Sequence, residues 1–377
     1  MPVNSAVVDP FHVSGSSPGR AARVAILGYG TVGSAVARRL VAGDTTRAQL
    51  QLTHIFDRRA DAKRSSLAPP AGASRAAAVV WTSRIEDIIQ SDADVVVEAL
   101  GGIEPAVGWI RASLLAGKSV VTANKQVVAR HGADLWALAA RQGRQLRFEA
   151  AVGGAMPIVR AVAEGLAGDR ICRLDAILNG TTNAVLCRMD AGGCSREEAV
   201  ADARARGFAE RDASADLDGS DAAAKLAILC GLAFGVRIDP AAVPTRSAAS
   251  IEPGDVARAR AEGGTIRQVA HAEYDRGRSA LTVWVAPVQV NRDSLFGRTV
   301  GPQNAALITG EHSGEIGIFG AGAGGSATAV AALSDVLAIA RDRAAIVPPP
   351  LLTSNFILLQ TSDFRLPTSD FELAEAV

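Results

Sequence analysis

Lysine is scarce in this chain of 377 residues. Lysine and arginine together number 39, but only four of these residues are lysines. Arginine keeps its proton in proteins, whereas a lysine in a desolvated site can release one and act as an acid or a base. In a chain that uses arginine by default, a lysine therefore indicates a position where arginine would not serve. The four are Lys63, Lys118, Lys125 and Lys225.

The chain also lacks an excess of charge of either sign. Acidic residues number 39, so the formal net charge is zero and the isoelectric point is near 7.0. Without a basic excess, nucleic acid and anionic membrane surfaces are not expected partners. No unbroken apolar run reaches membrane-spanning length, and residues 1–20 lack the basic start and apolar core of a signal peptide. We therefore expect neither a membrane partner nor a nucleic-acid partner.

Cysteine is rare, and its spacing does not suit a metal site. The four residues are separated too irregularly to form a Cys-x-x-Cys pair. Isolated cysteines of this kind are typical of reduced, buried thiols in cytosolic proteins. The sequence therefore predicts a cytoplasmic protein without a disulfide framework. The cysteines are Cys172, Cys187, Cys194 and Cys230.

Short apolar segments alternate with amphipathic helical patterns in the first part of the chain. Such alternation predicts a parallel sheet covered by helices on both faces, because each strand must bury both of its sides. The fold class is therefore α/β, beginning with a doubly wound, Rossmann-type domain. The predicted strands are 24–27, 50–56, 93–98, 119–122 and 145–148, with helices at 105–116, at 126–140 and from Pro157 onward.

The rhythm changes after Arg170, where longer strands and fewer helices predict a second, α+β domain. A glycine-rich turn near its end leads into a last helix, which is expected to return to the first domain. The second-domain strands are expected at 171–178, 281–290 and 305–309, and its helices at 196–205 and 221–234. The predicted division is a flexible leader (1–21), a dinucleotide-binding domain (22–155), a substrate domain (156–318), the glycine-rich loop and returning helix (319–341), and a tail (342–377).

The motif GYGTVG directly follows the first strand and opens a helix. In this context its glycines allow a tight turn and let the backbone approach a pyrophosphate at the helix N-terminus. Asp57, at the end of the next strand, suits the ribose hydroxyls of NAD. Arg58 follows it and suits the 2′-phosphate of NADP, so both cofactors remain open. The residues of the turn predicted to bind cofactor are Gly28, Gly30, Thr31, Val32 and Gly33.

Lys125 closes the sequence TANK after the fourth strand, at the edge of the sheet where ligands of α/β proteins bind. The simpler interpretation is a surface lysine at the start of a helix. A cation is disfavoured at a helix N-terminus, however, so a lysine placed there is expected to meet an anion.

The segment from Gly207 to Leu229 places five carboxylates ahead of an apolar helix. Ser220 is predicted to cap that helix, with Asp221 in its first turn. Asp221 and Lys225 are four residues apart and share one helix face. A lysine beside a buried face and several acids suits proton transfer, although an ordinary helical salt bridge is the alternative interpretation. The carboxylates are Glu210, Asp212, Asp216, Asp218 and Asp221.

Together these motifs resemble the homoserine dehydrogenase family. The resemblance rests on GYGTVG, EALGG (98–102), GKSVVTANKQVVARHG (117–132), ILNGTTN (177–183), the segment 207–229 and GAGAGGSATA (320–329). It covers residues 22–341, most of the chain, and segment 207–229 is its most family-specific part. The family interconverts L-aspartate 4-semialdehyde and L-homoserine with NAD or NADP, on the route to threonine and methionine.

The resemblance implies a role for each matching residue. Lys225 falls on the position credited as proton donor to the substrate oxygen, and Asp216 and Lys125 on further catalytic positions. Four residues match substrate-binding positions: Glu210, Asp221, Gly180 and Thr181. Lys125, Gly207 and Gly322 match cofactor contacts, and a monovalent-cation site (Na⁺ or K⁺) built from main-chain carbonyls is implied at Glu149, Val152, Gly154 and Met156.

The chain departs from the family pattern at two loop positions and at its C-terminal end. Ala213 and Ala321 stand where the family commonly has proline. Residues 342–377 are too few for the regulatory ligand-binding domain that many relatives append, so no threonine feedback through such a domain is expected. A homodimer built on the sheet of the second domain is implied. The competing functions are a dehydrogenase for another amino-acid semialdehyde and a non-catalytic dinucleotide sensor.

Overall fold

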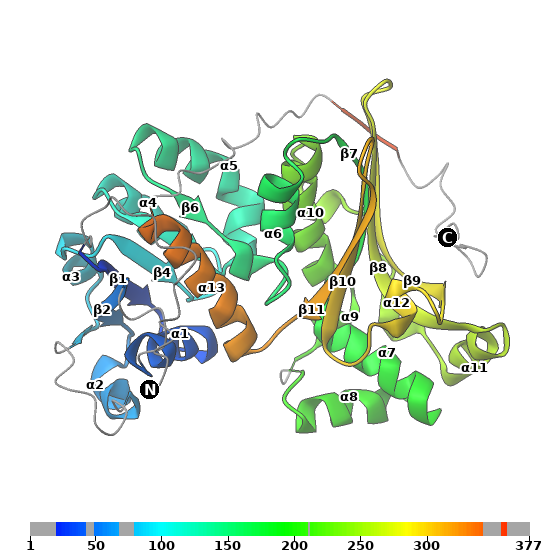
Figure 1. Ribbon diagram of the computed structural model, residues 1–377. Coiled ribbons are helices and arrows are strands. Elements are labelled where there is room, and N and C mark those ends of the chain that lie inside the picture. The colour runs from blue at the N-terminus through cyan, green and yellow to red at the C-terminus, as the bar shows by residue number, and fades with distance from the viewer. Residues whose placement is uncertain (1–19, 43–48, 68–78, 210–211, 342–355, 360–377) are drawn as a thin grey trace, which may run out of the picture.

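The computed structural model describes residues 20–42, 49–67, 79–209, 212–341 and 356–359, which form two six-stranded sheets with helices between and around them (Figure 1). All neighbouring strands of the first sheet are parallel, in the order β3-β2-β1-β4-β5-β6. This is the strand order of dinucleotide-binding doubly wound folds. The strands are β1 (Ala22–Leu27), β2 (Leu50–Phe56), β3 (Val80–Thr82), β4 (Val95–Glu98), β5 (Ser119–Thr122) and β6 (Leu146–Arg147).

Helices cover both faces of the first sheet, which explains why its central strands are continuously apolar. One face packs Ile110, Leu114 and Leu135 against alternate residues of β1, β4 and β5. The covering helices are α1 (Thr31–Ala42), α2 (Ala60–Lys63), α3 (Ile85–Gln90), α4 (Ala106–Leu115) and α5 (Lys125–Arg141), with a 3₁₀ turn at Arg64–Ser66.

The last long helix, α13 (Gly325–Ala340), lies against the first sheet although it follows the second in sequence (Figure 1). Its residues Ala329, Ala332 and Val336 are buried in one core with Val24 and Val36. The prediction that the C-terminal helix returns to the first domain is confirmed. The chain therefore passes to the second sheet after β6, returns to the first with α13, and reaches the second sheet again at β12 (Ile357–Leu358).

The second sheet has the order β11-β10-β7-β8-β9-β12 and is antiparallel except for the pairing of β12 with β9. Helix α10 covers the face directed toward the first sheet (Figure 1). The strands are β7 (Ile171–Ile177), β8 (Gly264–Asp275), β9 (Ala280–Asn291), β10 (Gln303–Gly310), β11 (Gly314–Ala321) and β12 (Ile357–Leu358). The helices are α7 (Gly180–Gly192), α8 (Arg196–Ala205), α9 (Ser214–Leu217), α10 (Ser220–Phe234), α11 (Pro253–Ala261) and α12 (Leu295–Arg298), with 3₁₀ turns at Pro240–Ala242 and Ala248–Ser250.

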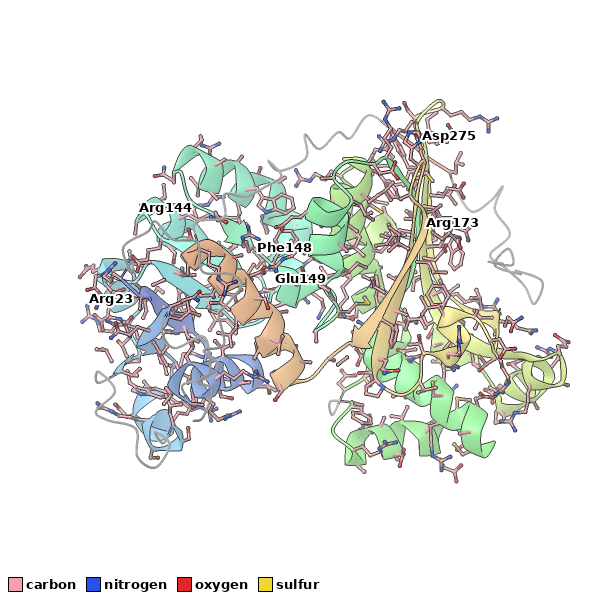
Figure 2. The ribbon with its side chains drawn as sticks, viewed as in Figure 1. Arg23, Arg144, Phe148, Glu149, Arg173 and Asp275 are labelled. Atoms are coloured by element: carbon pink, nitrogen blue, oxygen red, sulfur yellow. The ribbon has the colours of Figure 1, made fainter. Side chains whose placement is uncertain are left out.

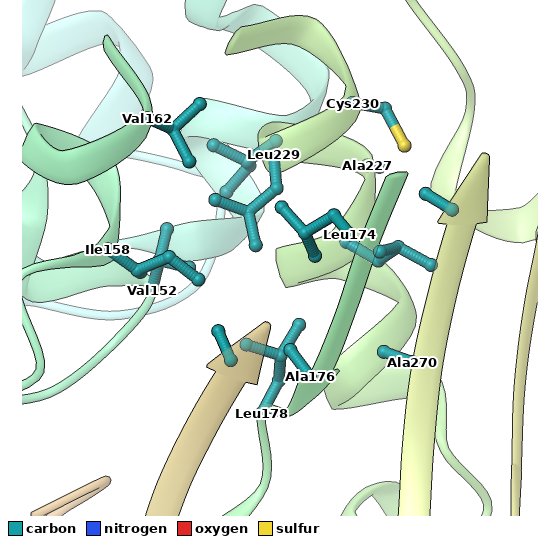
Figure 3. Close-up of a cluster of buried hydrophobic side chains, with 14 of the residues drawn as sticks. Val152, Ile158, Val162, Leu174, Ala176, Leu178, Ala227, Leu229, Cys230 and Ala270 are labelled. Atoms are coloured by element: carbon teal, nitrogen blue, oxygen red, sulfur yellow. The ribbon is translucent and has the colours of Figure 1, made fainter. Parts of the chain in front are cut away.

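An apolar core joins the second sheet to α5 and to the connection after β6. Figure 2 shows Phe148 and Glu149 at the junction, where a 3₁₀ turn (Glu149–Ala151), α6 (Ile158–Arg160) and a π turn (Ala161–Gly165) follow β6. Ile158 and Val162 from this connection point toward Leu229 of α10 (Figure 3). Because this connection shares one apolar core with α10 and the second sheet, the position of that sheet relative to the first is fixed by packing as well as by the chain.

The predicted strands of the first sheet are found within two residues of their predicted bounds, but β3 and α3 were not predicted. In the second domain, strands β8, β11 and β12 and helices α7, α9, α11 and α12 were not predicted. The prediction that Ser220 caps α10 is wrong: Gly219, with φ 89°, is the cap residue, and the Ser220 hydroxyl donates to the carbonyl of Ala215. The predicted leader (except residues 20–21) and most of the predicted tail lie outside the described residues.

Within the described parts of the chain, no helix combines the length and apolarity needed to cross a membrane.

Two glycines of the GYGTVG turn provide a matched test of the packing. A β-carbon at Gly33 would overlap the carbonyl oxygen of Gly28, whereas one at Gly30 would meet nothing within 4 Å. We expect Gly33→Ala to lower the free energy of unfolding by about 2 kcal/mol, the cost of overpacking. Gly30→Ala should change it by less than about 0.5 kcal/mol. Urea denaturation of both variants measures the difference, and equal stabilities would contradict this packing.

Candidate active site

A cleft of about 760 Å³ lies between the two domains and brings together nine of the predicted site residues. Its walls come from the start of α1, from α5, from the β7–α7 junction, from the segment before α10, from α10 itself and from the glycine-rich loop. This position, beyond the carboxyl ends of the parallel strands, is where α/β proteins bind ligands. The predicted residues that line it are Thr31, Val32, Lys125, Gly180, Thr181, Gly207, Asp216, Asp221 and Lys225.

The remaining predicted residues lie outside the lining of this cleft. Gly28, Gly30 and Gly33 form the turn beside it, and Asp57 accepts a hydrogen bond from the Tyr29 amide within that turn. Arg58 is exposed next to Asp57. Gly322 packs behind the cleft against the side chain of Asn304. Glu210 lies outside the described residues.

The glycine turn has the shape that a dinucleotide needs. Gly28 has φ 96°, which permits the tight turn between β1 and α1. The open space at Gly30 lets a ligand approach the backbone there, and Gly33 brings the helix close to the strand. Each glycine thus meets one geometric requirement of pyrophosphate binding at a helix N-terminus. These residues fit NAD or NADP.

Lys225, on α10, presents its ammonium group to the cleft. Its Nζ donates to the main-chain oxygen of Leu178 at 2.7 Å and lies 2.8 Å from Oδ2 of Asp221. The side chain is 12% exposed. An ammonium group has three donors, so two are held by these acceptors and one remains for a ligand in the cleft. The predicted pairing of Lys225 with Asp221 is therefore present, but it orients the lysine instead of removing it from the site.

Asp221 pairs with two lysines, and the pair with Lys125 links the two domains. Its Oδ1 lies 2.8 Å from Nζ of Lys125, at the start of α5, while Oδ2 faces Lys225. Burial alone would raise the pKa of Asp221, but the two ammonium groups outweigh it and hold the pKa well below its usual range. Lys125 thus meets an anion at its helix N-terminus, as predicted.

Asn179 was not predicted as a site residue, yet it organises the two acids of the cleft. Its Nδ2 donates to Asp216 Oδ1 at 2.7 Å and to Asp221 Oδ2 at 2.9 Å. Its Oδ1 accepts from the Thr182 amide and caps α7. The available signal was the motif ILNGTTN, in which an asparagine stands at a helix start.

Asp216 lies in a different electrostatic environment from Asp221. Its carboxylate accepts a hydrogen bond from the Asn179 amide, whereas that of Asp221 pairs with two ammonium groups. Burial raises the pKa of Asp216, and the neighbouring charge of Asp221 raises it further, against the hydrogen bond from Asn179. The two acids are therefore driven in opposite directions within one cleft, which is typical of catalytic sites.

Close backbone approaches form the rear of the cleft. A β-carbon at Gly180 would lie 2.6 Å from the carbonyl oxygen of Pro302, and that oxygen also accepts from the Gly322 amide. One at Gly322 would overlap the Asn304 amide, and one at Gly154 would overlap the Gly322 carbonyl. Glycine at these positions brings segments from β7, β10, β11 and the β6–α6 connection into contact.

The implied cation site lies on the β6–α6 connection. The carboxylate of Glu149 is buried and accepts from the amides of Val159 and Arg160, so only its main-chain carbonyl suits an ion. Burial, with the charge of Asp335, raises the pKa of Glu149 to about 7. The described residues contain no cluster of three or more His, Cys, Asp or Glu side chains able to hold a metal. A carbonyl site at Glu149, Val152, Gly154 and Met156 stays a prediction.

Sequence comparison with known proteins gives a consistent result. Residues 28–149 match the family model described as homoserine dehydrogenase, NAD binding domain, and residues 157–337 match the one described as homoserine dehydrogenase. The homoserine dehydrogenase of Corynebacterium glutamicum is 36% identical over 89% of this chain and 75% of that protein. The chain belongs to the homoserine dehydrogenase family. The Mycobacterium tuberculosis homoserine dehydrogenase is 37% identical over 85% of this chain and 72% of its own length.

Solved structures of homoserine dehydrogenases share the fold. The Thiobacillus denitrificans enzyme superposes with a TM-score of 0.82 at 30% identity, covering 91% of this chain and 80% of that one. A hyperthermophilic archaeal homoserine dehydrogenase, solved in complex with NADPH, gives a TM-score of 0.70 at 26% identity, covering 86% and 98%. The predicted family and the predicted α/β fold class are confirmed.

Removing the charge of Asp221 tests how far the cleft depends on it. Asp221→Asn leaves the mostly buried ammonium of Lys225 without its counter-ion, so we expect the free energy of unfolding to fall by about 3 kcal/mol at pH 7. The matched control is Asp218→Asn, the same change at an exposed residue three positions earlier.

The pH dependence of this loss has a defined sign. A carboxylate whose pKa is depressed in the folded protein stabilises it above its unfolded pKa, and this stability is lost as the pH falls through the folded pKa. The gap between wild type and Asp221→Asn should therefore stay constant from about pH 8 to pH 5 and narrow below about pH 4. Urea denaturation across this range measures it; a gap that grows toward acid pH would contradict the assignment.

Proposed function

We propose that this chain interconverts L-aspartate 4-semialdehyde and L-homoserine with NAD or NADP, and that Lys225 gives a proton to the substrate oxygen during reduction. One observation carries the proposal. The Lys225 ammonium is fixed by Asp221 and the Leu178 carbonyl, and it opens into a cleft that reaches the N-terminus of α1. A proton donor and a dinucleotide turn thus face one cavity.

The proton transfer follows from the contacts of Lys225. When bound, the nicotinamide supplies the hydride that reaches the aldehyde carbon. The developing negative charge on the substrate oxygen then needs a proton, which the remaining N–H of Lys225 donates. In the reverse direction the neutral amine accepts the proton of the homoserine hydroxyl. Asp221 acts by orienting Lys225 and Lys125, both of which lie 2.8 Å from its oxygens.

The zwitterionic amino-acid end of the substrate finds complementary groups in the same cleft. We propose that Asp216 binds its ammonium, since a carboxylate in a partly dry cleft forms strong charge-assisted hydrogen bonds. Glu210, which lies outside the described residues, is proposed for the same role on the family resemblance alone. Its carboxylate suits the N-terminus of α7 at Gly180 and Thr181, where main-chain amides and the helix dipole favour an anion. Thr181 is held there by its hydroxyl, which donates to the Phe208 carbonyl at 2.7 Å.

The cofactor contacts and the domain division extend this proposal. We propose Gly28, Gly30, Thr31, Val32 and Gly33 with Asp57, Arg58, Lys125, Gly207 and Gly322 as the cofactor contacts. Residues 22–155 are proposed as the dinucleotide-binding domain and 156–318 as the substrate domain.

The proposed homodimer uses the second sheet, where Phe319 of β11 is 65% exposed and would be covered by a partner. A cytoplasmic location is proposed because all four cysteines are free thiols.

Replacing Lys225 tests the proton-transfer role. Lys225→Arg keeps the positive charge but holds its proton, so we expect kcat for homoserine oxidation to fall by about 100-fold or more. Cofactor affinity should stay unchanged, because the residue belongs to the substrate end of the cleft. Initial-rate assays with NAD and NADP measure kcat, and fluorescence titration with the reduced cofactors measures cofactor affinity. Near-normal turnover would remove the acid–base role.

Two controls accompany this test. Lys225→Ala with unchanged cofactor affinity separates lost chemistry from damaged folding. Wild-type activity on a panel of small 2-amino alcohols separates homoserine from other substrates. Turnover of none of them, with cofactor still bound, would favour the dinucleotide sensor.

Asp216 predicts an acid limb in the pH profile. Its ionised form binds the substrate ammonium, and its pKa is raised. In the reduction of L-aspartate 4-semialdehyde, where Lys225 acts in its protonated form, kcat/KM should therefore fall as the pH drops through a value above the ordinary aspartate pKa of about 3.9. Asp216→Asn should lower kcat/KM at neutral pH and flatten that limb. Steady-state kinetics from about pH 4.5 to pH 8 measure both, with Asp218→Asn as control. An unchanged acid limb in Asp216→Asn would assign the titration to another group.

A further inference from the structure

Lys63 forms an ion pair with Asp57, the acidic residue predicted to bind the ribose beside the dinucleotide turn. Nζ of Lys63 lies 2.6 Å from Oδ2 of Asp57 and donates to the carbonyl of Tyr29 at 3.0 Å. The same carboxylate accepts from the amides of Tyr29 and Arg59. Tyr29 belongs to the glycine turn itself, so both the acid and the lysine lie beside the cofactor site.

The lysine changes what this acid can discriminate. An acidic residue at the end of the second strand favours NAD, because it binds the ribose hydroxyls and repels a 2′-phosphate. That repulsion requires a net negative charge. Here Asp57 is 9% exposed and its counter-ion Lys63 has a side chain 24% exposed, so the pair is poorly screened by solvent. The positive charge therefore cancels most of the negative field at the ribose position.

The residues that follow Asp57 add further positive charge. Arg58 and Arg59 are exposed next to it, and Arg64 is exposed after α2, against a single exposed acid, Asp61. Guanidinium groups bind phosphate oxygens through paired N–H donors. With Asp57 neutralised by Lys63, the local balance is positive, which suits a phosphate dianion. Each of these arginines alone is an ordinary solvated surface residue. Together, beside an acid whose charge is neutralised, they can bind a phosphate group.

We propose that Lys63 determines the cofactor specificity of this chain: by neutralising Asp57 at the dinucleotide turn, it admits the 2′-phosphate and makes NADP the preferred cofactor. The inference rests on the proposed function only in taking a nicotinamide dinucleotide as the ligand. It leaves the substrate and the role of Lys225 untouched.

Binding of two nucleotide fragments tests the proposal without turnover. Adenosine 2′,5′-bisphosphate carries the 2′-phosphate of NADP, and 5′-AMP lacks it. Isothermal titration calorimetry at constant ionic strength should show that the full-length wild-type chain binds the bisphosphate about ten-fold or more tightly than 5′-AMP. Lys63→Met should lose most of this preference, mainly through weaker bisphosphate binding. Equal affinity of the wild type for both fragments, or an unchanged preference in Lys63→Met, would overturn the proposal.

Two further variants separate specificity from general charge or folding damage. Arg111→Gln removes one exposed positive charge from α4 of the same domain and should keep the wild-type preference. Asp57→Asn removes the acid that Lys63 neutralises, so bisphosphate binding should survive in it and should also survive the double change with Lys63→Met. If Lys63→Met does not fold, loss of bisphosphate binding in Asp57→Asn still overturns the proposal.

The outcome is independent of the proposed enzyme activity. If homoserine is not a substrate, the fragment titration still reports the preference for the 2′-phosphate. If the titration shows no preference, homoserine oxidation with NAD and NADP at similar kcat/KM would retain the proposed function and reject the role of Lys63.

Discussion

The buried carboxylate of Asp221 is the contact on which the cleft depends. It binds Lys125 from the helix that follows β5 and Lys225 from its own helix, so a single charge joins the dinucleotide side to the substrate side. A buried acid is costly without partners, and two lysines with the amide of Asn179 supply them. The apolar core shared by α10 and the β6–α6 connection then holds these partners in register (Figure 3). Packing and charge thus specify one domain arrangement.

The scarcity of lysine has a structural explanation. Lys118 is 4% exposed and donates to the carbonyls of Ser91 and Ala93, while Lys63 binds Asp57 beside the glycine turn. With Lys125 and Lys225, which both bind Asp221, every lysine places a compact ammonium on specific acceptors, whereas a planar guanidinium needs acceptors in a fork. Arginine takes the remaining basic positions, most of them at the surface. The scarcity of lysine therefore pointed to two residues of the cleft, Lys125 and Lys225. It did not distinguish them from Lys63 and Lys118, which lie outside its lining.

Five of the six strands of the first sheet were predictable from sequence because they are buried on both faces and alternate with amphipathic helices. The short edge strand β3, in which Val80 is exposed, was not. The strands and helices of the second domain gave weaker sequence signals. Strand β11 is largely exposed and rich in glycine, and α7 opens with Gly180 and two threonines, which favour turns over helices. Ser220 was predicted as the cap because serine favours that position. The backbone of Gly219, whose φ is 89°, makes Gly219 the cap residue instead, and the sequence does not show this. Asn179 was not predicted as a site residue because its partners, Asp216 and Asp221, lie 37 and 42 residues away in the sequence.

The two acids of the cleft, Asp221 and Asp216, differ in their ionisation because their environments differ. Asp221 is surrounded by ammonium groups and stays ionised, so it orients the lysines but has no proton to give. Asp216 is half-buried beside another acid, and its raised pKa makes it the carboxyl group that responds to pH. Sites that place two carboxyl groups in opposed environments separate structural from titrating roles in this way. In the proposed mechanism the substrate oxygen is therefore left to an ammonium group, and Lys225 is proposed for this role because two of its three donors are held by the Leu178 carbonyl and Asp221.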